Sequence, residues 1–437
     1  MDQLLLKNVA LEGYQEPQSI LVEDGRIRSI TAQPPQVGPD ARVLDGKGRL
    51  AVPGLINFHT HLDKAGLAEV IPNRSGTIGE ARSVLFAYKK TMQKEDVKRR
   101  AREAIRRSIQ AGVVAIRTHV DIDPSIGLRG MEAILELKEE LKDVITLQVV
   151  AFPQEGITES PGTYQLMEDA LRLGADVVGG HLSIAADFEE HAARVFDLAE
   201  HFGKEVDIHV DYDIDRDYTK KSIRADGLAY PDALGIMAMC EEKMKRNFSA
   251  NVTASHLCGL DSVDPECAKQ IIALIRRAGV GVVALAPNNM FCNGRGDLCN
   301  TRRGVTKAKA LMEAGVPVFF GPDNLRDPFN PLGCEDMVVN ALLTAYACHF
   351  ATREDYEALL RMCTCDAAAR MGLKDYGLKE GCRADITLLD APDFQQVLCR
   401  AAKPTALIRG GSILFQNDAA TQWQAKAEAL LAPAEGC

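Results

Sequence analysis

Two histidines separated by one residue, His59 and His61, follow the apolar run 51–58. Alternate residues of a β-strand point to the same side, so both imidazoles can reach one metal ion. The pair alone would also fit ordinary packing histidines. Its meaning therefore depends on what the rest of the chain places beside it.

Three more polar residues stand at or just beyond the ends of apolar, β-branched runs: His209, His256 and Asp323. Imidazole and carboxylate ligands suit Zn²⁺, Fe²⁺ or Mn²⁺, and a metal with one open position lowers the pKa of bound water towards neutrality. We expect Asp323 to be both a ligand and the base that takes a proton from this water, and His256 to polarise the substrate or support the site. Such an aspartate can instead cap a helix, and a buried histidine can satisfy a carbonyl group. Five such residues at strand ends favour the metal site.

The sequence around these positions alternates between strand-like and helix-like patterns. Segments of helical period, such as 94–111 and 188–202, separate eight strand-like runs. The runs cover residues 51–58, 113–119, 145–151, 175–180, 205–210, 249–255, 279–286 and 316–321. Eight alternations predict an α/β fold, a (β/α)8 TIM barrel, whose catalytic groups lie at the C-terminal ends of the strands. The metal-ligand candidates fall at such ends.

Short strand patterns also occur at both ends of the chain. The pair Asp24–Gly25 predicts a turn between two strands, and β-rich sequence returns at 384–390 and 406–414. We expect the two ends to pair in a small β-sandwich domain. The expected domains are 1–50 (N-terminal part of the sandwich), 51–375 (hydrolase barrel) and 376–437 (C-terminal part of the sandwich).

The composition is that of an acidic globular protein. Of 437 residues, 46% are hydrophobic and 26% charged, and the formal net charge is -10. This balance argues against nucleic acid or an anionic membrane as a partner. No stretch approaches the roughly 20 apolar residues of a membrane span, and the N-terminus lacks a secretory signal, so a cytoplasmic location is expected. Barrel enzymes often associate, and a homo-oligomer is compatible with the sequence.

Several motifs resemble those of the amidohydrolase superfamily, and within it the cytosine deaminase branch that also contains N-isopropylammelide aminohydrolase. They are PGLINFHTHLDK at 53–64, RTHVD at 117–121, VAFPQEG at 150–156, ADVVGG at 175–180, TASH at 253–256, RRGVT at 302–306 and FGPDN at 320–324. The resemblance implies one divalent metal ion, Zn or Fe. Its implied ligands are His59, His61, His209 and Asp323. The resemblance also implies that His256 lies near the hydrolytic water and that Gln154 faces a pyrimidine-like ring.

One position departs from the pattern of this branch. Cytosine deaminases carry a glutamate three residues after the strand-five histidine, and this chain has Tyr212. A phenol with an ordinary pKa near 10 donates a hydrogen bond but is a poor proton shuttle at neutral pH. Tyr212 could polarise a substrate that needs no ring protonation, Asp211 or Glu155 could replace the glutamate, or the protein could have lost deaminase activity while keeping its metal.

Other differences concern the substrate pocket. Asn324 stands where cytosine deaminases have a second aspartate, and Phe329 stands where they have tryptophan. Both are expected to contact the substrate. His119 is expected either in the pocket or in a structural pair with Asp121 or Asp123, whereas His181 is interpreted as an ordinary loop residue.

The expected function is hydrolysis of a carbon–nitrogen bond other than a peptide bond. A metal-bound hydroxide would attack an amidine-like carbon of a small nitrogen heterocycle and release ammonia or an amine. Because Tyr212 replaces the usual glutamate, we expect a substrate other than cytosine. Hydrolysis of a cyclic amide or lactam, and a metal-binding homologue without turnover, are the two alternatives.

Overall fold

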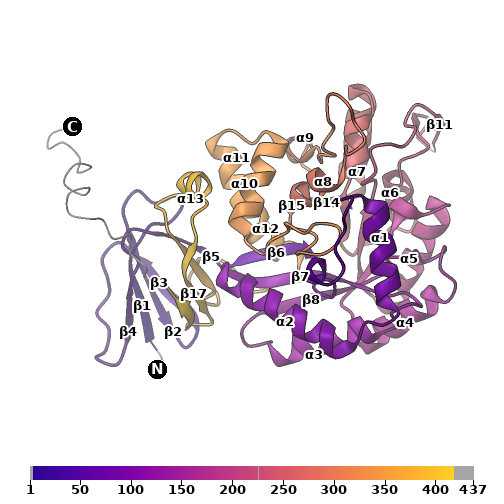
Figure 1. Ribbon diagram of the computed structural model, residues 1–437. Coiled ribbons are helices and arrows are strands. Elements are labelled where there is room, and N and C mark those ends of the chain that lie inside the picture. The colour runs from indigo at the N-terminus through magenta and orange to yellow at the C-terminus, as the bar shows by residue number, and fades with distance from the viewer. Residues whose placement is uncertain (1–2, 225, 418–437) are drawn as a thin grey trace.

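The computed structural model describes residues 3–224 and 226–417, which form a barrel and a smaller β unit beside it (Figure 1). Eight parallel strands make up the barrel sheet, in the order β15-β14-β13-β10-β9-β8-β7-β6. They are β6 (Leu55–Thr60), β7 (Val113–Asp121), β8 (Thr146–Phe152), β9 (Val177–His181), β10 (Glu205–Val210), β13 (Val252–His256), β14 (Val280–Ala284) and β15 (Val318–Phe320). The predicted (β/α)8 barrel is confirmed.

Helices surround this sheet and shield its outer face (Figure 1). Two of them, α2 (Lys94–Gln110) and α5 (Phe188–Phe202), coincide with the helical segments predicted from the sequence. The others are α1 (Ile78–Lys89), α3 (Arg129–Glu140), α4 (Thr163–Leu173), α6 (Ile236–Lys245), α7 (Pro265–Ala278), α8 (Ala286–Cys292), α9 (Ala308–Glu313), α10 (Met337–Cys348), α11 (Arg353–Met362), α12 (Cys365–Arg370) and α13 (Phe394–Arg400). Within the described residues, no helix combines the length and apolarity needed to cross a membrane.

The first predicted strand, 51–58, is wrong as a single element. Residues Leu50–Pro53 form β5, which pairs with a C-terminal strand of the β unit, and the barrel strand β6 begins only at Leu55. Gly54 separates the two strands. A Cβ atom there would lie 2.3 Å from Cγ1 of Val114, so only glycine lets the chain pass this close to β7. The apolar run therefore serves two sheets in succession.

The barrel closes between β6 and the segment that follows β15. The Asp323 amide donates to the His59 carbonyl oxygen at 3.2 Å, and the Thr60 hydroxyl donates to the Asp323 carbonyl oxygen at 2.8 Å. Gly321 makes this approach possible, because a Cβ atom at that position would lie 2.6 Å from the His59 carbonyl oxygen. The closure thus brings residues from opposite ends of the barrel sequence into direct contact.

The small β unit contains two four-stranded sheets that share one apolar core. One sheet consists of β1 (Gln3–Val9), β2 (Gln18–Glu23), β3 (Arg26–Thr31) and β4 (Arg42–Asp45); the other consists of β5, β16 (Ile386–Leu389), β17 (Pro404–Arg409) and β18 (Ser412–Gln416). The predicted turn at Asp24–Gly25 joins β2 to β3. The C-terminal strands pair with β5 and face β1–β4 across the core, so the predicted sandwich of both chain ends is confirmed. The expected C-terminal segment beyond residue 417 lies outside the described residues. A separate hairpin, β11 (Lys221–Ile223) and β12 (Ala229–Pro231), follows β10.

Candidate active site

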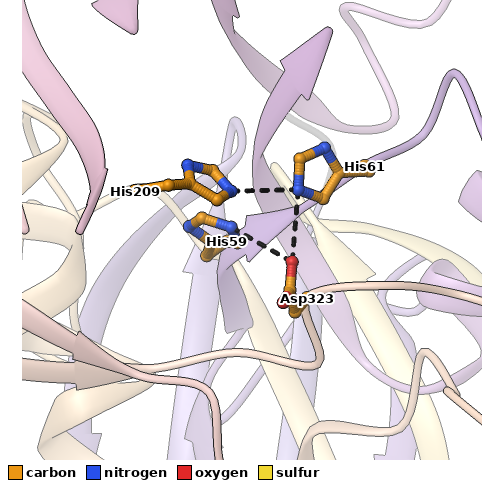
Figure 2. A group of neighbouring side chains, drawn as sticks. All are labelled: His59, His61, His209 and Asp323. Carbon is orange, nitrogen blue, oxygen red and sulfur yellow. Dashed lines mark hydrogen bonds and ion pairs between the residues drawn. The ribbon is translucent and has the colours of Figure 1, made fainter. Parts of the chain in front are cut away.

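Four predicted ligand residues converge at the C-terminal ends of the barrel strands (Figure 2). His59 and His61 come from β6 and its end, His209 from β10, and Asp323 from the closing segment after β15. Asp323 Oδ1 lies 3.3 Å from His59 Nε2 and 3.2 Å from His61 Nε2. His61 Nε2 lies 3.2 Å from His209 Nε2. The four side chains are buried, and their nearest ligand atoms all lie within 4.8 Å of one another.

The chemistry of this group fits a divalent metal ion. His59 Nε2 and Asp323 Oδ1 are buried and make no hydrogen bond within the described structure, which is costly unless another partner binds them. Burial lowers the pKa values of His61 and His209 well below the ordinary histidine range, so both imidazoles are neutral. Although burial opposes ionisation, His59 and His61 hold the pKa of Asp323 well below its usual value. Neutral imidazoles and an ionised carboxylate are the forms that bind metals.

A second layer of polar residues lies directly beneath the ligands. The Ser255 hydroxyl lies 3.0 Å from His59 Nδ1 and donates to Asp207 Oδ1 at 3.2 Å. The His119 ring lies against the His59 ring at a tilt of 30°, with centroids 4.0 Å apart, and its Nε2 lies 3.3 Å from the same carboxylate oxygen. Arg117 donates to the other oxygen of Asp207 at 2.9 Å. Hydrogen-bonded second layers of this kind fix the orientation of metal-binding histidines.

His119 does not occupy the place expected for a substrate-binding residue. It is fully buried in this second layer and is not part of the cavity wall among the described residues. Its carboxylate partner is Asp207, and neither Asp121 nor Asp123 forms the structural pair that the sequence suggested. Burial lowers the pKa of His119 to about 4, so the ring is neutral. The structure places it as a support for His59.

His256 and Asp323 face each other across the floor of the cavity. His256 Nε2 lies 3.9 Å from Asp323 Oδ2, and His256 Nδ1 contacts Asn289 Oδ1 at 2.8 Å. An amide oxygen can only accept, so Nδ1 carries the hydrogen and the lone pair of Nε2 points towards the site. Asn288 donates to Asp323 Oδ2 at 2.6 Å. Both His256 and Asp323 have left-handed backbone conformations, with φ of 76° and 64°, which are uncommon for residues other than glycine and are often found at functional sites.

Above these residues lies a small cavity. Three of the predicted substrate-binding residues, Gln154, Asn324 and Phe329, line it, as does Tyr212. His181, interpreted from the sequence as a loop residue, is the last residue of β9 and also lines the cavity, so that interpretation is wrong. The remaining lining residues are His61, Ile78, Arg82, His209, His256, Asn288, Asn289, Cys292, Asn293 and Asp323.

A buried lysine orients the amide of Gln154. Lys64 Nζ donates to Gln154 Oε1 at 2.6 Å and to Asp121 Oδ1 at 2.7 Å. Because an ammonium group can only donate, the amide must turn its oxygen towards Lys64. The Gln154 NH2 group is then left for the cavity, because His181 Nδ1 donates to the Gln154 backbone carbonyl oxygen at 2.9 Å and cannot accept.

Asn324 offers the cavity a hydrogen-bond acceptor, in contrast to the donor at Gln154. Its Nδ2 donates to Asp327 Oδ2 at 2.5 Å, which leaves the amide oxygen as the free acceptor. Asp327 in turn accepts from the backbone amides of Phe329 and Asn330 at 2.9 and 3.2 Å. The cavity therefore offers a donor at Gln154 and an acceptor beside Asp323.

The two carboxylates considered as replacements for the missing glutamate do not reach the cavity. Asp211 accepts hydrogen bonds from the backbone amides of Gly235 and Ile236 at 2.7 and 3.1 Å, at the start of α6. Glu155 accepts from the Ser125 hydroxyl at 2.6 Å. Among the described residues, Asp323 is the one carboxylate on the cavity wall.

Tyr212 itself lines the cavity and contacts Arg82, a residue the sequence reasoning missed. Arg82 Nη2 donates to the phenol oxygen of Tyr212. Burial raises the pKa of Tyr212 above its ordinary value, so the group is a phenol at neutral pH. Because Arg82 occupies the phenol oxygen, the phenol can donate its own hydrogen to a ligand. Arg82 lies on the helix α1 and not at the end of a barrel strand, where the sequence predicts the site residues.

A closed (β/α)8 barrel with three histidines and an aspartate grouped at the C-terminal ends of its strands defines a metal-dependent type of barrel hydrolase. Residues 42–415 match the sequence model of the Amidohydrolase family, and the chain belongs to this family. It is a hydrolase of carbon–nitrogen bonds.

Curated relatives and solved structures resemble the chain over almost its full length. It is 29% identical to N-isopropylammelide isopropyl amidohydrolase of Pseudomonas sp. strain ADP, over 95% of this chain and 98% of the relative. It is 28% identical to pterin deaminase of Rhizobium rhizogenes strain K84, over 94% and 92%. The crystal structure of 5-methylcytosine deaminase from Klebsiella pneumoniae with 5-fluorocytosine superposes with a TM-score of 0.87 at 32% identity, covering 96% of this chain and 99% of that one. The sequence-based resemblance to the cytosine deaminase branch is confirmed.

Proposed function

We propose that this protein hydrolyses a C–N bond at an amidine-like carbon of a nitrogen heterocycle other than cytosine and releases ammonia or an amine. The observation that carries the proposal is the pairing of a metal-ligand group with a small cavity whose wall holds one carboxylate, Asp323. The relatives support it, because their names specify deamination or removal of an alkylamine from nitrogen heterocycles.

His59, His61, His209 and Asp323 would hold one Zn or Fe ion. Such an ion acts as a Lewis acid and lowers the pKa of a water molecule that it binds. In our proposal Asp323 Oδ2, steadied by Asn288, takes a proton from the attacking water and passes it towards the leaving nitrogen. His256, whose Nε2 lone pair faces the cavity, orients the water or the developing charge.

The cavity wall would position the ring by its hydrogen-bonding groups. The Gln154 NH2 group donates to a ring oxygen or nitrogen, and the Asn324 oxygen accepts from the amino group that leaves. Tyr212 donates a hydrogen bond but does not transfer a proton, since burial raises its pKa. A substrate that needs no ring protonation, or whose ring is already electron-poor, suits this wall better than cytosine does.

The test is release of ammonia and amines from pyrimidines, triazines, pterins and small cyclic amidines by protein of known metal content. We expect turnover of at least one ring other than cytosine. Replacing Asp323 by Asn should reduce kcat about 10²- to 10⁴-fold, whereas the exposed Asp366→Asn should have no effect. Absence of release from every ring by fully loaded protein would refute the proposal.

A second candidate is hydrolysis of a cyclic amide or lactam. It is favoured by the absence of a second carboxylate from the cavity wall among the described residues, because ring opening of an amide requires no ring protonation. Ring opening without ammonia release, detected by mass spectrometry, would select this reaction. Full metal loading without either product would select a metal-binding homologue that does not turn over.

A further inference from the structure

The cavity wall formed by Gln154, Tyr212 and Arg82 presents hydrogen-bond donors. The oxygen of Gln154 is engaged by Lys64, and the phenol oxygen of Tyr212 is engaged by Arg82. What remains for a ligand is the amide NH2, the phenol hydrogen and the rest of the guanidinium group. We call these three residues the donor wall.

Arg82 has no acidic partner among the residues that the structure describes. A guanidinium group has five N–H donors, and the structure gives a partner only to the one that reaches Tyr212. Within residues 3–224 and 226–417 no carboxylate lies within ion-pair distance of Arg82, whereas Arg302 pairs with Asp297 and Asp215. Because Asp323 belongs to the ligand group, the charge of Arg82 is not neutralised by the cavity.

An unpaired, half-buried guanidinium group facing a cavity is a recognition element for oxyanions. Its planar fork matches a carboxylate or a similar pair of acceptor oxygens, and the interaction strengthens where water is partly excluded. A purely structural role as an anchor for Tyr212 would need one neutral donor and no charge. The cationic side chain is therefore more than the contact with Tyr212 requires.

We infer that the heterocycle bound here carries an acidic oxygen group, a ring carboxylate or an ionised ring hydroxyl, which is held by Arg82 and the donor wall while the amidine-like carbon faces the metal-ligand group. This inference rests on the proposed function and narrows its substrate class. It predicts that discrimination comes from charge at the edge of the ring remote from the metal.

The experiment compares matched ligands that differ in this charge. They are 5-carboxycytosine against 5-methylcytosine, isocytosine-6-carboxylate against 6-methylisocytosine, and barbiturate, whose ring oxygen is ionised at neutral pH, against uracil. Ammonia release gives kcat/KM for the first two pairs, and calorimetry on metal-loaded protein gives affinities for all three. The variants are Arg82→Gln, Arg82→Lys and, as a control, Arg74→Gln, an exposed arginine in the segment before α1.

The native protein should favour at least one charged ligand over its neutral partner by 10-fold or more. Arg82→Gln should weaken that ligand about 10- to 100-fold, the range of one charged hydrogen bond, and should weaken the neutral partner by a clearly smaller factor. Arg82→Lys should restore part of the preference, and Arg74→Gln should match the native protein. Preference for barbiturate alone identifies an ionised ring oxygen, and preference for the carboxylates identifies a carboxylate.

Two results would overturn the inference: equal or weaker binding of every charged ligand by the native protein, or an equal loss for both members of a pair in Arg82→Gln, which marks a structural role. A failure of the proposed function can be told apart from a failure of this inference. If no ligand releases ammonia, calorimetry still tests the role of Arg82 in binding. If neutral rings are hydrolysed with no preference for charge, the proposed function is supported and this inference is refuted.

Discussion

Replacing Lys64 by Met tests the buried ion network that supports the cavity. Lys64 is 1% exposed and donates to Asp121 at 2.7 Å, while Lys89, also 1% exposed, reaches Asp121 and Asp123 at 2.6 Å each. Methionine keeps the apolar stem of lysine and removes its charge. Asp121 would then share one lysine with Asp123, and the oxygen of Gln154 would lose its donor.

The expected loss of stability can be estimated from the burial of Lys64 and its partners. Removing one member of a fully buried ion pair costs about 3 to 5 kcal/mol, because the remaining charge stays desolvated. We expect Lys64→Met to lower the free energy of the first unfolding transition by this amount. The double variant Lys64→Met with Asp121→Asn should be less unstable than the sum of the single variants by about 0.5 to 3 kcal/mol, the usual coupling between contacting residues.

Urea unfolding of the metal-loaded protein, followed by circular dichroism, measures the effect. Lys94→Met is the matched control, since Lys94 makes an equally short contact of 2.7 Å with Glu136 but lies at the surface, and it should cause no measurable change. A loss below 1 kcal/mol for Lys64→Met with an unchanged denaturant slope would refute the argument that this network is desolvated. A loss for both variants would show that the assay reports lysine content and not burial.

Further predictions concern the metal, the glutamate replacement and pH. His209→Asn should abolish metal binding in elemental analysis while circular dichroism stays native; retained metal would contradict the ligand assignment. Asp207→Asn, which breaks the link to His59 through Ser255, should weaken metal affinity about 10- to 100-fold in competition with a chelator. An unchanged affinity would show that Asp207 does not support the metal ligands. Tyr212→Glu should create or raise ammonia release from cytosine, and Tyr212→Phe should not. Burial raises the pKa of Asp327 to about 7, so the folded state holds a proton that the unfolded state loses near pH 4. Because of Asp327, the free energy of unfolding should therefore fall by about 2 to 3 kcal/mol between pH 5 and 8. This contribution to the fall should be absent in Asp327→Asn. An identical pH profile of the two proteins would show that Asp327 is ionised in the folded protein.

The barrel and the ligand group could be predicted because both follow from short-range sequence patterns. Alternation in β6 places His59 and His61 on one side, and strand ends in a barrel meet at one face, which brings His209 and Asp323 to them. The height of a residue within the barrel depends on the register between strands. Thr60 pairs with Thr118, which sets the His119 ring on His59 and below the cavity. That register is not visible in the sequence of either strand.

The sequence predicts Gln154 and Tyr212 of the donor wall, but Arg82 escaped prediction for a different reason. Arg82 lies on α1, within the long excursion that leaves the barrel after β6, and its position over the cavity depends on how that excursion packs. Asn288 and Asn289 lie on the short helix α8 after β14, where an Asn-Asn pair resembles an ordinary turn. The orientation of Gln154 depends on Lys64, a residue from another strand end. Such positions are fixed by tertiary packing and carry no local pattern.

The charges of the metal-ligand group and of the polar layer beneath it also favour an anionic ligand, as the donor wall does. The Asp323 carboxylate gives the ligand group one negative charge, and because metal-bound imidazoles are neutral, a divalent ion would bring the group to +1. Beneath it, Asp207 forms an ion pair with Arg117. With Arg82 unpaired and no other carboxylate on the wall among the described residues, a metal-loaded cavity would be cationic. A cation-rich, partly desolvated cavity favours an anionic ring over a neutral one of the same shape, and this holds whether the bond that breaks is exocyclic or lies within the ring.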